Sequence, residues 1–95
     1  MFRFETVNIR GKEYEFFSYS VGTAPLLILR GTKGYAMCGY LNLEAAEKLG
    51  DTAVRVTGVK DLETLLKANV VGVTSKARSM GLSEGQKVDE IISLL

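Results

Sequence analysis

The residue best suited to chemistry is Cys38, the single cysteine of the chain. It lies at the end of a predicted strand, shortly before Asn42, which can cap a helix that begins at Leu43. A thiol near a helix N-terminus can have a lowered pKa and act as a nucleophile. Free cysteine is also among the most buried residue types. A catalytic Cys38 and a core Cys38 are therefore both open hypotheses.

The chain contains no histidine. This excludes Ser-His-Asp and Cys-His nucleophile systems and nearly all zinc sites, so that a carboxylate, a lysine or a tyrosine would have to act as any base. The carboxylates are dispersed, and their spacing nominates none of them. Tyr35 and Tyr40 bracket Cys38 and can line a pocket with it, although aromatic residues of strands more often belong to the core. We expect no cofactor and no metal site.

Three glycines flank the cysteine: Gly31, Gly34 and Gly39. Their backbone amides lead into the predicted helix at Leu43 and can form a concave anion site. The spacing matches neither the dinucleotide fingerprint nor the P-loop. The alternative is that these glycines make ordinary hairpin turns. An anion or nucleotide binder therefore stays among the hypotheses.

Composition restricts the class of protein. The chain has 95 residues, 46% of them hydrophobic, which supports a single domain over residues 1–95 with one core. Twelve basic and eleven acidic residues give a net charge of +1. Because a basic excess is missing, we do not expect nucleic-acid binding. One cysteine allows no intrachain disulfide, and no apolar stretch approaches the ~18 residues of a membrane span. We therefore expect a cytoplasmic protein without a membrane segment.

The elements that position these residues begin with two hairpins. Residues 2–9 and 12–19 read as strands joined at Arg10 and Gly11, and residues 26–29 and 35–38 read as a second pair, with Pro25 at its start. Helix 43–49 then ends at Gly50, strand 52–57 follows, and Asp61 caps helix 62–68 before strand 70–73.

The last part of the chain reads as helical. Thr74 or Ser75 begins a short helical turn that ends near Gly81, and residues 83–86 form a capping box, from Ser83 to Gln86, for a last helix. The predicted fold is α+β: one mixed, largely antiparallel sheet of five to six strands, with three to four short helices.

Aromatic residues gather in the first hairpin. Six of the eight lie there: Phe2, Phe4, Tyr14, Phe16, Phe17 and Tyr19. Neighbouring Phe16 and Phe17 must point to opposite faces of a strand, so both faces carry large apolar groups. Since the predicted helices are too short to cover both faces, we expect a homo-oligomer that assembles through this hairpin. The alternative is a hairpin folded over its own core.

Several short motifs resemble those of the YunC-like domain family. The resemblance is carried by residues 24–27, 34–35, 38–42, 49–51 and 57–60, and it continues at Asp61, Leu65, Leu66, Val70, Ser75, Ala77, Gly81 and Gly85. It covers about three quarters of the chain but little of the first twenty residues. It implies a small cytosolic α+β domain without an established substrate, in which Cys38, Gly39, Tyr40 and Asn42 belong to the central motif.

The leading hypothesis is an oligomeric binding module with a small pocket near the turn of residues 38–42. The expected ligand-binding residues are Tyr35, Cys38, Gly39, Tyr40 and Asn42, and the expected ligand is a small molecule. The alternative is a thiol-dependent enzyme with Cys38 as nucleophile, and the second alternative is the anion or nucleotide binder.

Overall fold

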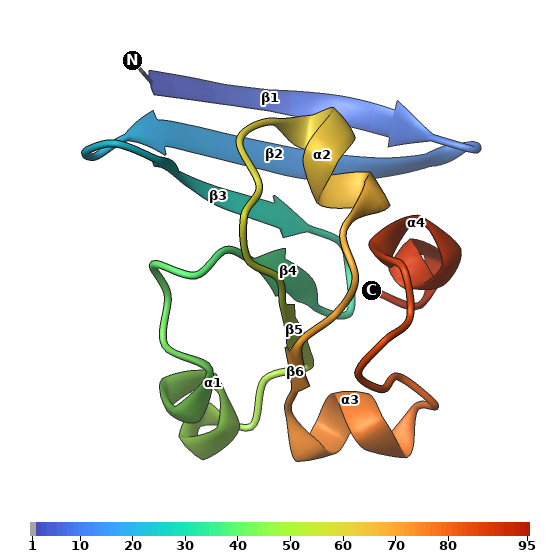
Figure 1. Cartoon of the computed structure of the whole chain (residues 1–95). Coiled ribbons are helices and arrows are strands. Elements are labelled where there is room, and N and C mark those ends of the chain that lie inside the picture. The colour runs from blue at the N-terminus through green and yellow to red at the C-terminus, as the bar shows by residue number, and fades with distance from the viewer. Residues whose placement is uncertain (1) are drawn as a thin grey trace.

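The computed structural model describes residues 2–95 and contains one six-stranded mixed sheet with the order β1-β2-β3-β4-β5-β6 (Figure 1). The strands are β1 (Phe2–Ile9), β2 (Lys12–Ser20), β3 (Pro25–Arg30), β4 (Tyr35–Met37), β5 (Ala53–Arg55) and β6 (Gly72–Val73). The helices are α1 (Leu43–Leu49), α2 (Leu62–Lys67), α3 (Ser75–Ser79) and α4 (Val88–Ile91), followed by the 3₁₀ turn η1 (Ile92–Leu94). Among these six strands of residues 2–95, β4 and β5 pair in parallel and the other neighbours pair antiparallel. The predicted fold class is confirmed.

The first hairpin closes as predicted. Ile9 pairs with Lys12, which leaves Arg10 and Gly11 as a two-residue turn. Both have positive φ, 49° and 89°, as a type I′ turn requires. The side chain of Asn8 accepts a hydrogen bond from the Gly11 N–H at 3.0 Å. Local turn chemistry therefore sets the register of β1 against β2.

Helix α1 connects the two parallel strands and has the predicted bounds. The Asn42 side chain accepts from the Ala45 N–H at 3.2 Å, which satisfies one of the free donors of the first turn. Gly50 takes the left-handed conformation at φ 78°, and its N–H donates to the Glu47 carbonyl at 3.1 Å. The chain therefore stops its helix at Leu49 and turns into β5.

The predicted start of the last helix is wrong. The Gln86 side chain accepts from the Ser83 N–H at 2.8 Å, as in a capping box, but Gly85 has φ 94° and the helix begins at Val88. Tertiary bonds explain the difference, because Val70 donates to the Gln86 carbonyl and accepts from the Gly85 N–H, both at 2.8 Å. Residues 83–86 are thus held as a turn.

Other boundaries differ by one to three residues. Strands β5 and β6 are shorter than the predicted 52–57 and 70–73, β4 ends at Met37 rather than Cys38, and α2 ends at Lys67 rather than Ala68. The element types and their order agree with the prediction.

The main core lies between one face of the sheet and the helices α2, α3 and α4. Phe16, Leu29 and Val54 on the sheet pack with Leu65, Val88 and Ile92 from the helical side, and all six are fully buried. Helix α1 covers the other face, where Ala46 packs against Met37 and Ala53. Helix α1 covers this face only at the β4 and β5 end of the sheet. None of the helices in residues 2–95 is long and apolar enough to cross a membrane.

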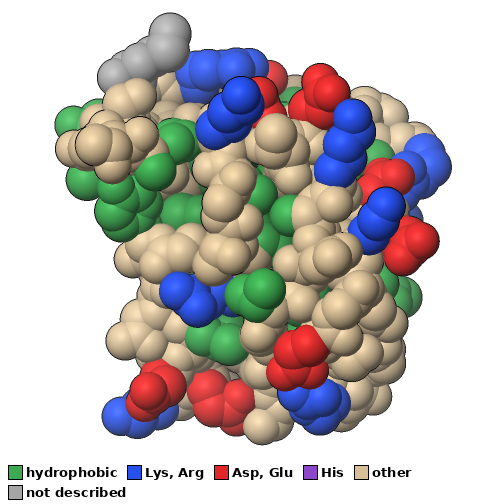
Figure 2. Space-filling model, in the orientation of Figure 1, with side chains coloured by type: hydrophobic (Ala, Val, Ile, Leu, Met, Phe, Trp, Pro, Cys, Tyr) green, Lys and Arg blue, Asp and Glu red, His purple; other side chains and the backbone are tan. Residues whose placement is uncertain are grey.

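The aromatic residues of the hairpin divide between the two faces. Tyr14 and Phe16 are in the core, whereas Phe17 is only half-buried on the opposite face. Pairing places Phe2, Phe4, Phe17 and Tyr19 on that opposite face, which we call the open sheet face together with Leu26 and Ile28 of β3. Figure 2 shows hydrophobic side chains gathered at the side of the molecule where β1 begins and β2 ends.

Candidate functional site

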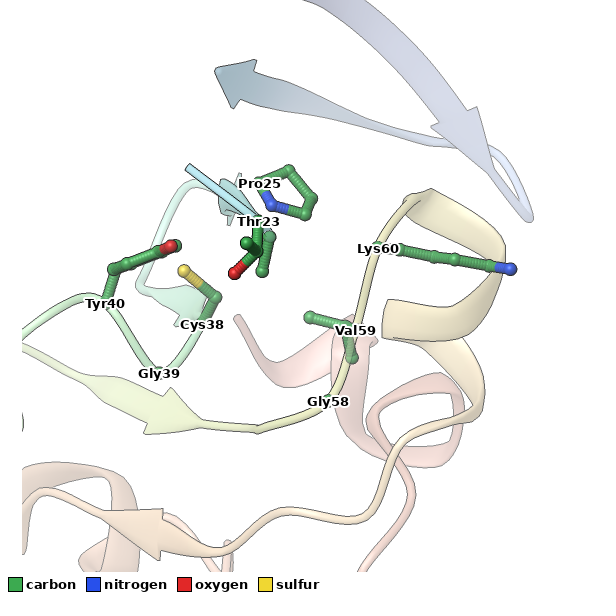
Figure 3. A pocket seen from close by; sticks show the side chains of 9 residues that line it. Thr23, Pro25, Cys38, Gly39, Tyr40, Gly58, Val59 and Lys60 are labelled. Atoms are coloured by element: carbon green, nitrogen blue, oxygen red, sulfur yellow. The ribbon is translucent and has the colours of Figure 1, made fainter. Parts of the chain in front are cut away.

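A pocket of about 440 Å³ lies at the edge of the sheet where β4 and β5 end and β3 begins (Figure 3). It is lined by Thr23, Ala24, Pro25, Cys38, Gly39, Tyr40, Gly58, Val59 and Lys60. Apart from Pro25, the first residue of β3, these residues come from three loops, which precede β3, follow β4 and follow β5.

Strand direction brings these loops together. Because β4 and β5 are parallel, with Met37 paired with Arg55, the loops that leave them start at the same edge. Strand β3 is antiparallel to β4, so its beginning lies at that edge too. Ligands of open sheets bind outside the carboxyl ends of parallel strands for the same reason. The pocket is therefore a consequence of the β4-α1-β5 crossover.

Cys38 is the most buried residue of the pocket lining. It is 3% exposed, and its Sγ accepts a hydrogen bond from the Leu27 N–H at 3.2 Å. In Figure 3 the sulfur faces the space between Tyr40 and Thr23. The Leu41 N–H donates to the Cys38 carbonyl at 3.2 Å, which closes the turn that exposes Gly39 and Tyr40. The thiol is thus buried in the protein but directed toward the pocket.

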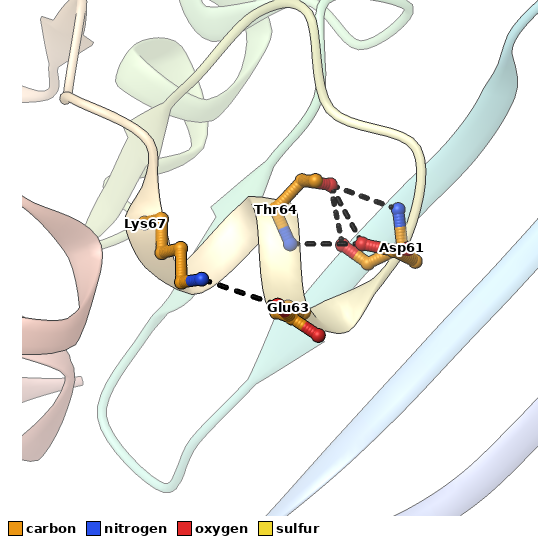
Figure 4. A network of polar contacts seen from close by, with 4 residues as sticks. All are labelled: Asp61, Glu63, Thr64 and Lys67. Atoms are coloured by element: carbon orange, nitrogen blue, oxygen red, sulfur yellow. Dashed lines mark hydrogen bonds and ion pairs between the residues drawn. The ribbon is translucent and has the colours of Figure 1, made fainter.

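The wall opposite Cys38 is held by the cap of α2. The Asp61 carboxylate accepts from the Thr64 N–H at 2.8 Å, and the Thr64 hydroxyl oxygen accepts from the Asp61 N–H at 3.1 Å (Figure 4). The Thr64 hydroxyl oxygen also accepts from the Lys60 N–H at 2.9 Å. The bond from the Thr64 backbone, followed by its hydroxyl, lowers the pKa of Asp61. Val59 points into the pocket, whereas the Lys60 side chain extends away from it (Figure 3). The cap of α2 therefore fixes the orientation of Val59 and Lys60, so that the charged group of Lys60 lies outside the pocket.

The lining of the pocket is mainly apolar and contains a few polar groups. Ala24, Pro25 and Val59 supply hydrocarbon, and the hydroxyls of Thr23 and Tyr40 can donate or accept. No carboxylate lines the pocket in the part of the chain that the structure describes. Nor do residues 2–95 contain a group of three or more Cys, Asp or Glu side chains placed to hold a metal ion. The arrangement suits an uncharged small molecule with a hydrogen-bonding group.

Two of the five predicted ligand-binding residues lie elsewhere. Asn42 caps α1, and Tyr35 lies at the opposite end of β4 from Cys38. The Tyr35 hydroxyl donates to the Asp51 carboxylate at 2.7 Å in a separate polar hollow of about 250 Å³. Burial, followed by this hydrogen bond and the Asp51 charge, raises the pKa of Tyr35 to about 12. The structure thus brings together Cys38, Gly39 and Tyr40 of the predicted set.

The candidate anion site at Gly31 and Gly34 has its amides already bonded. The N–H groups of Lys33 and Gly34 donate to the main-chain oxygen of Leu95, at 2.6 and 2.8 Å. A Cβ added at Gly31 would collide with the backbone of Leu95, and one at Gly34 with the backbone of Thr52. Close backbone packing therefore accounts for both glycines. Gly39 is the member of the candidate set that reaches the pocket.

Sequence reasoning did not assign the loops of residues 23–25 and 58–60 to the site. Both loops contain motif residues, but their spacing along the chain gives no sign of proximity. The strand, helix, strand order over residues 35–57 could have indicated that the loop after residue 57 lies near Cys38. A parallel crossover there places the residues after each strand at one edge of the sheet.

Comparison with known proteins adds a family but no activity. The sequence pattern of a family described as a domain of unknown function, DUF1805, matches residues 37–95. A solved structure described as a protein of unknown function, TA1206 from Thermoplasma acidophilum, is 46% identical to this chain with a TM-score of 0.97. That match covers 100% of this chain and 93% of the other. No curated protein matches the chain.

Proposed function

The chain belongs to this family of unknown function, and we therefore propose its role from the pocket itself: it binds an uncharged, mainly apolar small molecule. The observation that carries the proposal is the meeting of three loops around an apolar hollow at the carboxyl ends of β4 and β5. Small-molecule sites are typically such hollows, with a small number of placed polar groups that fix the orientation of the ligand.

Two further observations support binding at this position. The segments that carry the YunC-like resemblance, residues 38–42 and 57–60, contribute to two of the three loops, and we retain that resemblance as part of the proposal. Cys38, Thr23 and Tyr40 place a thiol and two hydroxyls around the same space. Since Cys38 forms no disulfide, the proposal assigns the module to a reducing compartment such as the cytoplasm.

A titration with phenol tests the proposal. Phenol combines an apolar ring with one hydroxyl, as the lining requires. In NMR spectra of the labelled protein, we expect the amide signals of residues 38–40 and 58–60 to shift in a saturable manner. Ala24 is exposed at the pocket wall, so the Ala24→Phe variant should fold normally. Because its ring takes up space in the pocket, the changes of these amide signals on addition of phenol should be at least tenfold smaller than in the parent.

The matched control is Ala45→Phe, which adds the same ring to an exposed alanine of α1 away from the pocket. It should leave the phenol titration unchanged. Shifts that are scattered over the surface, or that survive Ala24→Phe undiminished, would overturn the proposal.

The second candidate function is a thiol-dependent enzyme. It is favoured by one observation, the direction of the Cys38 sulfur toward the pocket (Figure 3). Against it stands the lining, which offers no carboxylate to serve as a base and turns the Lys60 amine away from the interior, so that Tyr40 is the remaining lining residue of a type that could act as the base. The binding module therefore remains the leading proposal.

A further inference from the structure

Arg55 is the one arginine of residues 2–95 that forms no ion pair. The others each hold a carboxylate oxygen at 2.8 or 2.9 Å: Arg3, Arg10, Arg30 and Arg78. Arg55 instead donates from Nη2 to the carbonyl oxygen of Gly39 at 3.2 Å. Since a guanidinium always carries its positive charge and offers five N–H donors, most of its bonding capacity is unused within the described chain.

The sheet holds this charge partly inside the protein. Arg55 alternates with Ala53 on β5 and pairs with Met37, so it lies on the sheet face that α1 covers. Its side chain is half-buried, and its Nε atom is buried without a hydrogen-bond partner. A buried donor of a charged group costs free energy when it has no acceptor. An acceptor from outside the chain would therefore stabilise this side chain.

A hollow of about 400 Å³ lies beside the guanidinium. It is lined by Arg55 and by residues 40–44, which form the turn after Cys38 and the first residues of α1. The Asn42 side-chain oxygen is bonded in the cap of α1, which leaves its NH₂ group as a second donor at the hollow. Glu44 is the one acidic residue of this lining; it is exposed and forms no ion pair with Arg55 in the part of the chain that the structure describes.

We propose that this hollow binds a small oxyanion, a phosphate or carboxylate group, through the Arg55 guanidinium. The planar N–H groups of arginine match the oxygen atoms of both groups, and charge-assisted hydrogen bonds of this kind are stronger than neutral ones. The bond from Nη2 to Gly39 fixes the orientation of the guanidinium before the anion arrives. The bound anion supplies the counter-ion that the other four arginines have within the chain.

This oxyanion site does not rest on the proposed function. It shares Tyr40 with the apolar pocket, and the remaining lining residues of the two hollows differ. The proposal also moves the predicted anion site from the amides of Gly31 and Gly34, which are bonded within the chain, to the side chain of Arg55. Ala24→Phe, which fills the apolar pocket, should leave oxyanion binding unchanged, so that each proposal can fail without the other.

An NMR titration observed at the arginine side chains tests the proposal. Sodium phosphate replaces sodium chloride at constant ionic strength and pH 7. The Nε–H signal of Arg55 should shift in a saturable manner, whereas those of the four ion-paired arginines should stay. A second titration with sodium acetate distinguishes the two sources of the oxyanion: tighter binding of phosphate assigns a phosphate group, and tighter binding of acetate assigns a carboxylate.

Three variants locate the bound phosphate, with the backbone amide signals of residues 40–44 as the readout. Arg55→Met keeps a stem of similar length but removes the charge, and phosphate should bind roughly tenfold more weakly. The matched control is Arg78→Met, which removes an arginine from its ion pair with Glu84 and should leave the titration unchanged. Glu44→Gln removes the negative charge at the hollow and should strengthen phosphate binding about threefold.

An Arg55 Nε–H signal that moves with neither anion overturns the proposal. So does a phosphate titration that persists undiminished in Arg55→Met. If that variant does not fold, Glu44→Gln keeps the proposal open to contradiction, because unchanged or weaker phosphate binding would place the anion away from this hollow.

Discussion

Leu27 and Cys38 hold each other by two hydrogen bonds: the Leu27 N–H donates to the Cys38 Sγ at 3.2 Å, and the Cys38 N–H donates to the Leu27 carbonyl at 3.2 Å. Leu27 is fully buried and Cys38 nearly so. The thiol therefore has a structural task at the base of the pocket, because it supplies the acceptor for a backbone donor that water cannot reach.

Cys38→Ala should consequently lower the free energy of unfolding by more than the lost packing contacts of one sulfur atom would. The Leu27 N–H would be left buried without a partner, at a cost of about 1–3 kcal/mol. Cys38→Ser keeps an acceptor at the same position and should cost less. Urea denaturation of the three proteins measures the difference. An alanine variant as stable as the parent would mean that the bond to sulfur contributes nothing.

The two hypotheses for Cys38 differ in the reactivity of the thiol. In the binding module, native protein should react with iodoacetamide at pH 7 at least tenfold more slowly than urea-unfolded protein, because Cys38 is 3% exposed. Phenol should slow the reaction further if it fills the pocket. A native rate equal to or above the unfolded rate would favour the thiol-dependent enzyme instead.

Gly34 should not accept even one added methyl group. Its Cβ would collide with the Thr52 backbone and lie 2.9 Å from the Thr52 Cβ, and β4 cannot move without breaking its pairing with β5. Gly34→Ala should therefore cost about 1–3 kcal/mol.

The matched control for this substitution is Gly39→Ala, whose Cβ would have its nearest neighbour at 3.6 Å and should change stability by less than about 0.5 kcal/mol. Thermal unfolding compares the two variants. Equal midpoints would contradict the close approach of β4 and Thr52.

The Tyr35 and Asp51 pair predicts a stability change at alkaline pH. The pKa of Tyr35 is raised from 10.0 to about 12 in the folded protein, by burial first and by Asp51 second. Because the folded state holds this proton more tightly, the contribution to stability is complete below pH 10 and is lost as the pH rises through about 12. The absorbance of tyrosinate should show one group of the parent that titrates near pH 12.

Two variants test whether Tyr35 is the tyrosine that titrates near pH 12. Tyr35→Phe should remove the late titration. Asp51→Asn should keep it but shift it toward the ordinary value, since the charge is lost while the burial remains. A late titration that persists in Tyr35→Phe would belong to a different tyrosine.

Local sequence was enough for features that depend on neighbours in the chain. The turn at Arg10 and Gly11, the Asn42 cap and the left-handed Gly50 each involve contacts within three or four residues, and the structure confirms all three. The alternation of Phe16 and Phe17 likewise follows from strand geometry alone. The element order, and with it the α+β class, could be read for this reason.

Tertiary structure alone decided the rest. The last helix begins at Val88 because Val70 bonds to the backbone of Gly85 and Gln86, a partnership that spacing along the chain does not indicate. The pocket exists because β4 and β5 pair in parallel, which brings the loop at Cys38 to the loop at Val59. Long-range pairing is chosen by the burial of the whole core rather than by any one segment. Sequence therefore identified the motif residues of the site, and only the assembled sheet determined which of them share a cavity.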